Sequence, residues 1–406
     1  MSCEITLPFP VAYITRDLER ALGIPQIPGF FIMTNETAFG KSQCKVRSDI
    51  FFCSQKRILD THELLLDEKI LSTLRDNHIA HIMVFKPTTA IERAAKANGL
   101  TVLNPPASLA SSFEEKITQL SFLPELKNIF VPFHVMTLKE VLFSGTPFVL
   151  QFNHAHTGNG THYIDSEKKL TELQMQFPER PVRMAPFITG PLFTNNNIVT
   201  KQDTLVGNIN CQITGLEPFT KNIFATIGND WALPHILLSA EETNEYYKVA
   251  KCVGDALKKR NWKGMFGIDV LYDMHAKKFF LLEINARQSA SATFESFLQT
   301  HAGKQITTME AHLMALIEKP IDGELQPISE GAQVTQKNIL PAMPPDAQYT
   351  LTQTFEREGY RVTPYENTER EQEWLRIQTT RGGLMQNHNT LNTAGKQIAD
   401  ILRNTL

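Results

Sequence analysis

Hydrophobic and polar positions in the first third of the chain follow the order strand, helix, strand. Residues 79–85 form a mostly apolar run, and Thr89 with Glu92 has the pattern of a capping box that begins a helix. Gly99 ends this helix, and Thr101–Leu103 return to an extended chain. Strands that alternate with helices predict an α/β layer with a parallel sheet.

The pattern changes after Pro147, where short strands become more frequent. We expect strands over Phe148–Phe152 and Val182–Ile188, separated by a loop and by a polar helix from Ser166 to about Gln176. Two further extended stretches are predicted near Asn197–Val199 and Thr204–Ile213.

A long helix and a pair of strands complete this middle region. The helix begins at the capping box of Ser239 and Glu242 and runs to about Arg260, with apolar residues recurring at helical spacing. The strands Met265–Tyr272 and Lys278–Ile284 follow, joined by a short turn. Later helices are expected over the segments Ala292–Thr300, Thr307–Ile317 and Thr393–Leu402.

Changes in this pattern place two domain boundaries, near residues 110 and 320. We therefore predict an N-terminal α/β domain (1–110), a central domain (111–320) and a small C-terminal domain (321–406) with no recognisable chemistry.

Composition narrows the class of protein. Of 406 residues, 40 are Lys or Arg and 43 are Asp or Glu, so a net charge of -3 gives no reason to expect a nucleic-acid partner. Five cysteines without a C-x-x-C pair favour a reducing compartment. No apolar run approaches the roughly 20 residues of a membrane span, and the N-terminus does not resemble a signal peptide. We expect a soluble cytoplasmic protein without a membrane partner, whose oligomeric state is open.

The candidate chemistry is concentrated in the last two strands of the middle region. Asp269 lies in one apolar strand, and Glu283 and Asn285 lie in the next, where alternate residues share a face. If the strands pair as a hairpin, the three side chains converge, and burying them is unfavourable unless a cation such as Mg²⁺ compensates. The alternative is that both acids point to solvent.

A glycine-containing loop directly follows the strand Phe148–Phe152. Gly158 and Gly160 would allow backbone N–H groups to approach a phosphate closely, although a flexible hairpin loop explains them equally well. The nearby His154, His156 and His162 match no zinc-site spacing.

Together, these elements resemble the ATP-grasp superfamily, especially its carboxylate–amine and carboxylate–thiol ligases. The likeness covers about residues 75 to 300 and is most specific in the stretches I-D-V and L-L-E-I-N-A-R. It implies an N-terminal βαβ domain of the pre-ATP-grasp kind and a central ATP-grasp fold of two α+β lobes clasping ATP. A small C-terminal domain would follow.

The resemblance also implies roles for individual residues. Asp269, Glu283 and Asn285 would hold Mg²⁺, with Mn²⁺ as an alternative ion, and Arg287 would lie near the transferred phosphate. Lys116 resembles a nucleotide-binding lysine in a helix, its alternative being a surface lysine. Phe187 and Ile188 occupy the hinge whose backbone would pair with adenine, and ordinary core positions explain them nearly as well.

The chain departs from the family pattern around the expected phosphate and ribose contacts. Gln151 stands where a second phosphate-binding lysine is usual, and Arg183 on the neighbouring strand is a candidate substitute. Ala185 and Leu192 stand where glutamates are common, so ribose contacts would have to come from elsewhere, with the run 195–197 (three asparagines) as a candidate source.

The resemblance implies an ATP-dependent, ADP-forming ligase that activates a small-molecule carboxylate as an acyl phosphate for attack by an amine. A non-catalytic or degenerate ATP-binding protein is the main alternative. A βαβ oxidoreductase is disfavoured because the turn after residues 79–85 contains no G-x-G-x-x-G.

Overall fold

The computed structural model describes residues 5–153, 160–303, 305–340, 343–344 and 346–406. At the N-terminal end, a parallel sheet has the strand order β3-β2-β1-β4-β5. Its strands are β1 (Val11–Ile14), β2 (Phe30–Thr34), β3 (Ile50–Phe52), β4 (His81–Val84) and β5 (Thr101–Val102). Its helices are η1 (Leu18–Ala21), α1 (Ala38–Gln43), α2 (Thr61–Leu64), α3 (Glu68–Asp76) and α4 (Thr89–Ala97). The predicted strand, helix and strand over residues 79–103 are confirmed.

The predicted cap of helix α4 is wrong by one position. Thr88, not Thr89, is the N-cap, and its side chain accepts a hydrogen bond from Ile91 N. Glu92 instead accepts a hydrogen bond from Ala107 N at 2.7 Å and so ties α4 to the next helix. Gly99 adopts a φ of 69°, the left-handed conformation that ends the helix as predicted.

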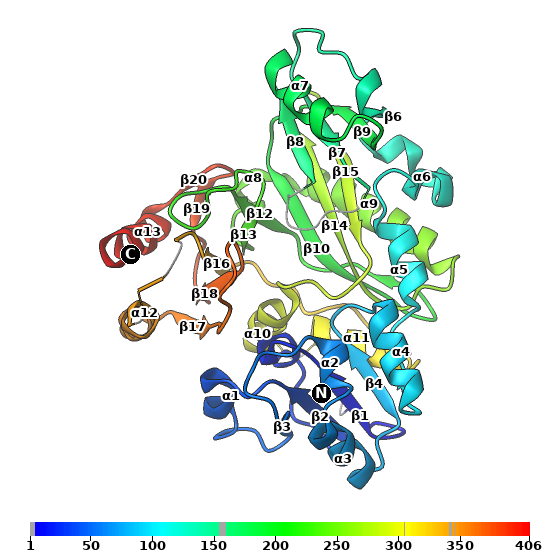
Figure 1. Cartoon of the computed structure of the whole chain (residues 1–406), viewed down its shortest axis with the longest axis vertical. Coiled ribbons are helices and arrows are strands. Elements are labelled where there is room, and N and C mark those ends of the chain that lie inside the picture. The colour runs from blue at the N-terminus through cyan, green and yellow to red at the C-terminus, as the bar shows by residue number, and fades with distance from the viewer. Residues whose placement is uncertain (1–4, 154–159, 304, 341–342, 345) are drawn as a thin grey trace.

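A small antiparallel sheet in the order β6-β9-β7-β8 forms the upper lobe in Figure 1. It follows α5 (Ala107–Glu114), α6 (Gln119–Phe122) and η2 (Pro124–Ile129). Its elements are β6 (His134–Thr137), η3 (Leu138–Glu140), β7 (Phe148–Gln151), β8 (Thr161–Ile164), α7 (Glu167–Gln176) and β9 (Pro181–Pro186). Leu150 and Val182 on one face pack with Leu170 and Leu173 of α7, which leaves the opposite face toward the large sheet.

The large sheet occupies the middle of the molecule, and its neighbouring strands run antiparallel in the order β15-β14-β10-β12-β13-β16-β18-β17. Its strands are β10 (Leu192–Val199), β11 (Thr204–Leu205), which pairs with β10, β12 (Asn210–Thr214), β13 (Thr226–Asp230), β14 (Gly264–Asp273), β15 (Lys278–Asn285), β16 (Ala332–Lys337), β17 (Arg361–Pro364) and β18 (Glu373–Thr379). The stretch predicted as one strand over Thr204–Ile213 is therefore two, separated by residues 206–209, where any side chain at Gly207 would collide with Asn196 O.

Helices cover one face of this sheet, and further helices and strands follow toward the C-terminus. Residues of α9 (Ala240–Lys258), including Tyr246 and Val253, pack against apolar side chains of β10, β14 and β15. The remaining elements are α8 (Pro234–Leu237), α10 (Ala292–Ala302), α11 (Thr308–Leu316), α12 (Ala347–Arg357), β19 (Met385–Asn387), β20 (Thr390–Leu391) and α13 (Thr393–Thr405).

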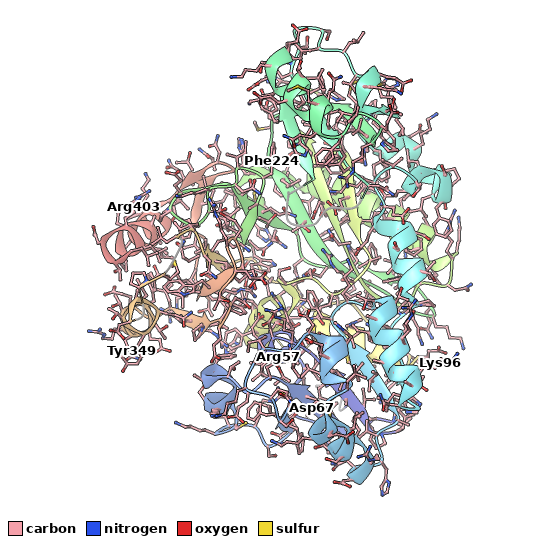
Figure 2. The ribbon with its side chains drawn as sticks, viewed as in Figure 1. Arg57, Asp67, Lys96, Phe224, Tyr349 and Arg403 are labelled. Atoms are coloured by element: carbon pink, nitrogen blue, oxygen red, sulfur yellow. The ribbon has the colours of Figure 1, made fainter. Side chains whose placement is uncertain are left out.

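Strands from beyond residue 320 thus continue the sheet of the middle region, on the left in Figure 1, while the boundaries near 110 and 320 stay predictions. Exposed side chains such as Tyr349 and Arg403 lie on the outer helices of this part (Figure 2). Among the described helices, none has the length and apolar character needed to cross a membrane.

Candidate active site

The β14–β15 hairpin brings the three predicted metal ligands together. Asp269 is paired directly with Glu283, and Gly267 with Asn285. Residues paired across antiparallel strands share a face, so both carboxylates and the amide lie on the same side of the sheet. Asn285 Nδ2 donates a hydrogen bond to Asp269 Oδ2 at 3.3 Å. The predicted hairpin and the convergence of these side chains are confirmed, while their role in metal binding stays a prediction.

The face that carries these groups is the one turned away from α9. On the opposite face Ile268, Val270 and Ile284 are buried in the core that α9 covers. The small sheet contacts this hairpin, since Arg183 Nη1 of β9 donates to Leu282 O of β15. Glu283 of the hairpin and Asn153, which follows β7, line one cavity, which we call the cleft.

Asp269 is half-buried beside a second acid. Burial, and then the charge of Glu283, raise its pKa to about 6, although hydrogen bonds from Thr194 and Asn285 and the charge of Arg287 oppose this rise. Gln212 Nε2 also donates to Asp269 Oδ1 at 2.6 Å. The pair of acids is thus a place where a bound cation would relieve an unfavourable charge. Thr194 and Gln212 were not predicted, because only the sheet register shows that they adjoin Asp269.

Lys116 supplies part of the compensating charge. It lies in the turn that follows α5, so its predicted position inside a helix is wrong, and it is buried, so the surface-lysine alternative is wrong as well. Its Nζ lies 3.1 Å from Glu283 Oε2. Residues 107–114 are helical, but the chain leaves the helix at Glu115, whose φ and ψ are extended.

Arg287 is held next to the acids by two partners. Its Nη1 donates to Asn285 Oδ1 at 2.8 Å and lies 3.7 Å from Glu114 Oε1. Glu114 in turn accepts a hydrogen bond from Lys86 Nζ at 2.7 Å. Sequence reasoning missed Glu114 and Lys86 as members of this cluster, since they are far apart in the chain and carry no motif. A cavity of about 230 Å³ lies here, lined by Glu114, Glu283, Lys86 and their neighbours.

Gln151 and Arg183 lie opposite one another on the small sheet, on the face turned to the cleft. Arg183 is 1% exposed, its Nη1 donates to Leu282 O at 3.5 Å, and its guanidinium lies 4.2 Å from the centre of the Phe133 ring. Burial lowers its pKa to about 10, while Glu283 opposes that shift. Arg183 therefore places a positive charge beside Glu283, and Gln151 contacts Thr161 on the adjacent strand.

The remaining predicted residues lie near the connection between the two lobes. Phe187 and Ile188 follow β9 and precede β10, and the exposed Phe187 ring lies 4.5 Å from that of Tyr163. Gly160 O accepts a hydrogen bond from Phe152 N. Gly158 lies outside the described residues, as do His154 and His156.

The proposed source of ribose contacts is wrong. Asn195 and Asn197 are fully buried and donate to one another at 2.8 and 2.9 Å, on the side of the sheet covered by α9. Asn196 points to the other side but is also buried and donates to Ser291 and Glu295. None of the three side chains is free to bind a nucleotide.

The donor set fits a hard divalent cation. Asp269 and Glu283 offer carboxylate oxygens, and Asn285 offers an amide oxygen, the ligand types that Mg²⁺ prefers. The described part of the chain contains no cluster of three His, Cys, Asp or Glu side chains suited to a metal, so an ion here depends on the amide as well as the two acids. On binding, it would compete with Lys116 for Glu283 and with Arg287 for Asn285.

Comparison with solved structures identifies the fold, whereas comparison by sequence finds no match. No family model matches the sequence, and no curated protein matches it by sequence. Among solved structures, carboxyaminoimidazole ribonucleotide synthase from Aspergillus clavatus, complexed with ATP, is similar over 98% of this chain and 99% of its own, with 14% identity and a TM-score of 0.66.

Two other similar structures are ligase and carboxylase enzymes. L-amino acid ligase from Bacillus licheniformis is 14% identical over 99% of this chain and 98% of its own, with a TM-score of 0.62. Biotin carboxylase from Campylobacter jejuni is 12% identical over 91% of this chain and 86% of its own, with a TM-score of 0.64. All three are ATP-grasp enzymes, and at these identities the likeness is one of fold. This chain, with its parallel N-terminal sheet and two-lobed centre, therefore has the ATP-grasp fold.

Proposed function

We propose that this protein is an ATP-dependent, ADP-forming ligase that joins a small-molecule carboxylate to an amine. The observation that carries the proposal is the convergence of Asp269, Glu283, Asn285 and Arg287 on one face of a cleft in an ATP-grasp fold. The similar Aspergillus clavatus enzyme was solved with ATP, which supports ATP as the nucleotide. A cytoplasmic location and a homo-oligomer stay predictions.

The acids and the amide would hold Mg²⁺ or Mn²⁺. When bound, the ion supplies a positive charge that draws electron density from phosphate oxygens. The chain itself contributes positioning. Asn285 and Glu114 both contact Nη1 of the Arg287 guanidinium, so its position is restrained before substrates arrive.

Phosphoryl transfer to a carboxylate needs charge neutralisation more than a side-chain nucleophile. Lys116, from the turn after α5, and Arg183, from the small sheet, are buried cations beside Glu283. Arg183 is 1% exposed, so it would make up for the charge that Gln151 lacks through its field at Glu283 and not through contact with a phosphate. The acyl phosphate formed would then react with the amine, releasing phosphate.

A non-catalytic ATP-binding protein is the second candidate. It is favoured by the ion pair between Lys116 and Glu283, because this lysine already satisfies a carboxylate that the ligase needs for a metal. It is also favoured by the neutral Gln151. The two candidates differ in whether the protein converts bound ATP to ADP.

The test is ADP release measured with Mg²⁺, ATP and pools of amino acids and carboxylates, for the natural protein and for Glu283→Gln. We expect Glu283→Gln to lower the rate at least about 100-fold, because a proposed metal ligand and its charge are lost. The exposed Glu241 on α9 provides the control Glu241→Gln, whose rate should equal that of the natural protein.

Equal rates for the natural protein and a folded Glu283→Gln would refute the proposed metal site. Tight ATP binding without turnover on any pool would instead favour the non-catalytic candidate.

A further inference from the structure

A second cavity lies apart from the candidate active site, between the N-terminal and C-terminal parts of the chain. Its volume is about 410 Å³. The residues that line it come from η1 and α1 in the N-terminal part, from α10, and from α12, β17 and β18 in the C-terminal part. None of the residues that line it belongs to the Asp269–Glu283 cluster. A volume of this size accommodates a small organic molecule. We name it the Arg361 cavity.

A single arginine dominates the chemistry of this cavity. The Arg361 guanidinium lies 3.5 Å from the centre of the Phe297 ring, a cation–π contact that covers one of its faces. Within the described ranges, its N–H groups meet no carboxylate within ion-pair distance and no hydrogen-bond acceptor. The ring thus fixes the direction of a cation whose donors are free to bind an anion.

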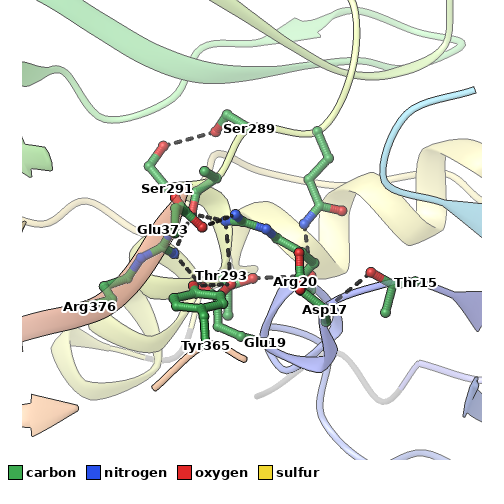
Figure 3. A network of polar contacts seen from close by, with 12 residues as sticks. Thr15, Asp17, Glu19, Arg20, Ser289, Ser291, Thr293, Tyr365, Glu373 and Arg376 are labelled. Atoms are coloured by element: carbon green, nitrogen blue, oxygen red, sulfur yellow. Dashed lines mark hydrogen bonds and ion pairs between the residues drawn. The ribbon is translucent and has the colours of Figure 1, made fainter. Parts of the chain in front are cut away.

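The other charged groups at the cavity do not neutralise Arg361. The Glu19 carboxylate lines the cavity, but its oxygens bind Arg376 Nη1 at 2.6 Å and Tyr365 Oη at 3.1 Å (Figure 3). Glu356 is exposed at the end of α12 and forms no ion pair in the described part of the structure. Among the described residues, the cavity thus carries one unpaired cation, Arg361, and one exposed carboxylate without an ion pair, Glu356, so a ligand with a single negative charge suits it better than one with two.

The other residues that line the cavity indicate which kind of molecule would fit beside Arg361. The side chains of Leu22, Phe39 and Phe294 provide an apolar surface, and Phe294 and Phe297 lie parallel with an interplanar angle of 12°. Gln378 also lines the cavity. Its Nε2 donates to Gln333 Oε1 at 3.1 Å, so its carbonyl oxygen is the atom left to accept a hydrogen bond.

We propose that the Arg361 cavity binds a small organic monocarboxylate with an aromatic or similarly apolar body. The carboxylate pairs with the guanidinium edge, and the apolar body packs against the phenylalanine rings. A phosphate ester would fit less well, because it brings two negative charges to one cation. This site is separate from the carboxylate-binding site that the ligase proposal requires in the cleft.

The test is isothermal titration calorimetry of the full-length protein with phenylacetate as the probe and phenylacetamide as its uncharged analogue. We expect one phenylacetate to bind per chain and phenylacetamide to bind at least about tenfold more weakly. Arg361→Met should weaken phenylacetate binding by at least about tenfold, since the cation is lost while an unbranched apolar side chain is kept. The control is Arg357→Met, because Arg357 is exposed and its one hydrogen bond among the described residues goes to Gln353 O, four residues earlier on α12.

Three outcomes would overturn the proposal. The first is no phenylacetate binding up to about 10 mM, and the second is equal binding by the natural protein and a folded Arg361→Met protein. The third is loss of binding in Glu283→Gln, because the carboxylate would then occupy the cleft. Unchanged binding in Glu283→Gln supports the separate site whether or not the protein proves to be a ligase.

Discussion

Individual residues in the cleft balance one another's charge. Asp269 is half-buried beside Glu283, and its raised pKa, about 6, reflects first the reduced contact with solvent and then the neighbouring acid. Lys116 and Arg287 approach from different elements and offset part of this repulsion. The cluster is therefore built to accept a further cation.

A buried histidine makes stability depend on pH. His312 Nδ1 accepts a hydrogen bond from Met265 N at 3.0 Å, and burial lowers the pKa of His312 from 6.5 to about 3. The folded protein keeps this ring neutral while the unfolded chain protonates it below pH 6.5, so its contribution to stability is lost as pH falls below that value. Between pH 6.5 and about 3, this one group lowers the free energy of unfolding by about 1.4 kcal/mol per pH unit.

The variant His312→Asn tests this dependence, because Asn Oδ1 keeps an acceptor for Met265 N but does not titrate. We expect the variant to be about 1–2 kcal/mol less stable at pH 7, owing to lost volume, and to show a shallower fall on acidification. Urea unfolding at pH 7, 6 and 5 measures this. Equal pH slopes for the two proteins would contradict it, and exposed His275→Asn controls for loss of a histidine in general.

At the scale of elements, a bulge in β15 decides which side chains enter the cleft. Asp269 pairs with Glu283 but Val270 pairs with Leu281, so Leu282 is the extra residue. Strict alternation would put Leu281 and Glu283 on one face. The bulge instead keeps Leu281 in the core and turns Glu283 toward Asp269, while Leu282 O accepts a hydrogen bond from Arg183.

The capping box of α9 gives an element-scale prediction. Ser239 accepts a hydrogen bond from Glu242 N, and Glu242 Oε2 accepts one from Ser239 N at 2.8 Å. Ser239→Ala removes the first of these bonds and should lower the free energy of unfolding by about 1 kcal/mol in a urea titration. Ser166 at the N-cap of α7 makes no capping hydrogen bond, so Ser166→Ala should change stability by only a few tenths. Equal effects of the two variants would refute the assignment to capping.

At the scale of the whole molecule, a buried ionic network joins the two ends of the chain (Figure 3). Arg376 of β18 binds Glu19 at 2.6 Å and Glu373 at 2.7 Å, and Arg20 binds Glu373 at 2.6 Å. Burial by itself would raise the pKa of Glu373, but Arg20 and Arg376 hold it well below its ordinary value. These contacts link η1 to the large sheet across more than 350 positions of sequence.

Removing the central arginine should destabilise the whole chain. Arg376→Met removes one of the two buried arginines that Glu19 and Glu373 share and leaves both acids to Arg20 alone among the arginines of this network, so we expect a loss of about 3 kcal/mol in the free energy of unfolding. Adding Glu19→Gln should recover part of this loss, because Arg20 then has one buried carboxylate to neutralise and not two. Thermal and urea unfolding measure both effects, with Arg403→Met, an exposed ion pair on α13, as the control. A loss no larger than that of the control would show that the network contributes little.

Much of the fold was readable from the order of residues alone, because it rests on local preferences. Apolar periodicity predicted β4, α4, α9 and the β14–β15 hairpin close to their observed bounds, and Gly99 marked a helix end. Helix and strand periods and the turn between paired strands depend on neighbours a few positions away. Local alternation placed Glu283 and Asn285 on one face of their strand, but the bulge at Leu282 decided that Asp269 shares that face.

Only the tertiary structure decided which groups surround those three side chains. Lys116, Glu114, Gln212 and Arg183 reach the cluster from separate elements, and the burial of Asn195 and Asn197 removed them from the site. Charge balance and burial depend on distances between segments remote in sequence, which no local pattern records. The amino-acid sequence determined the helices, the strands and the positions of the acids along them. The packing of the sheets and helices determined which groups contact those acids and how far their pKa values shift.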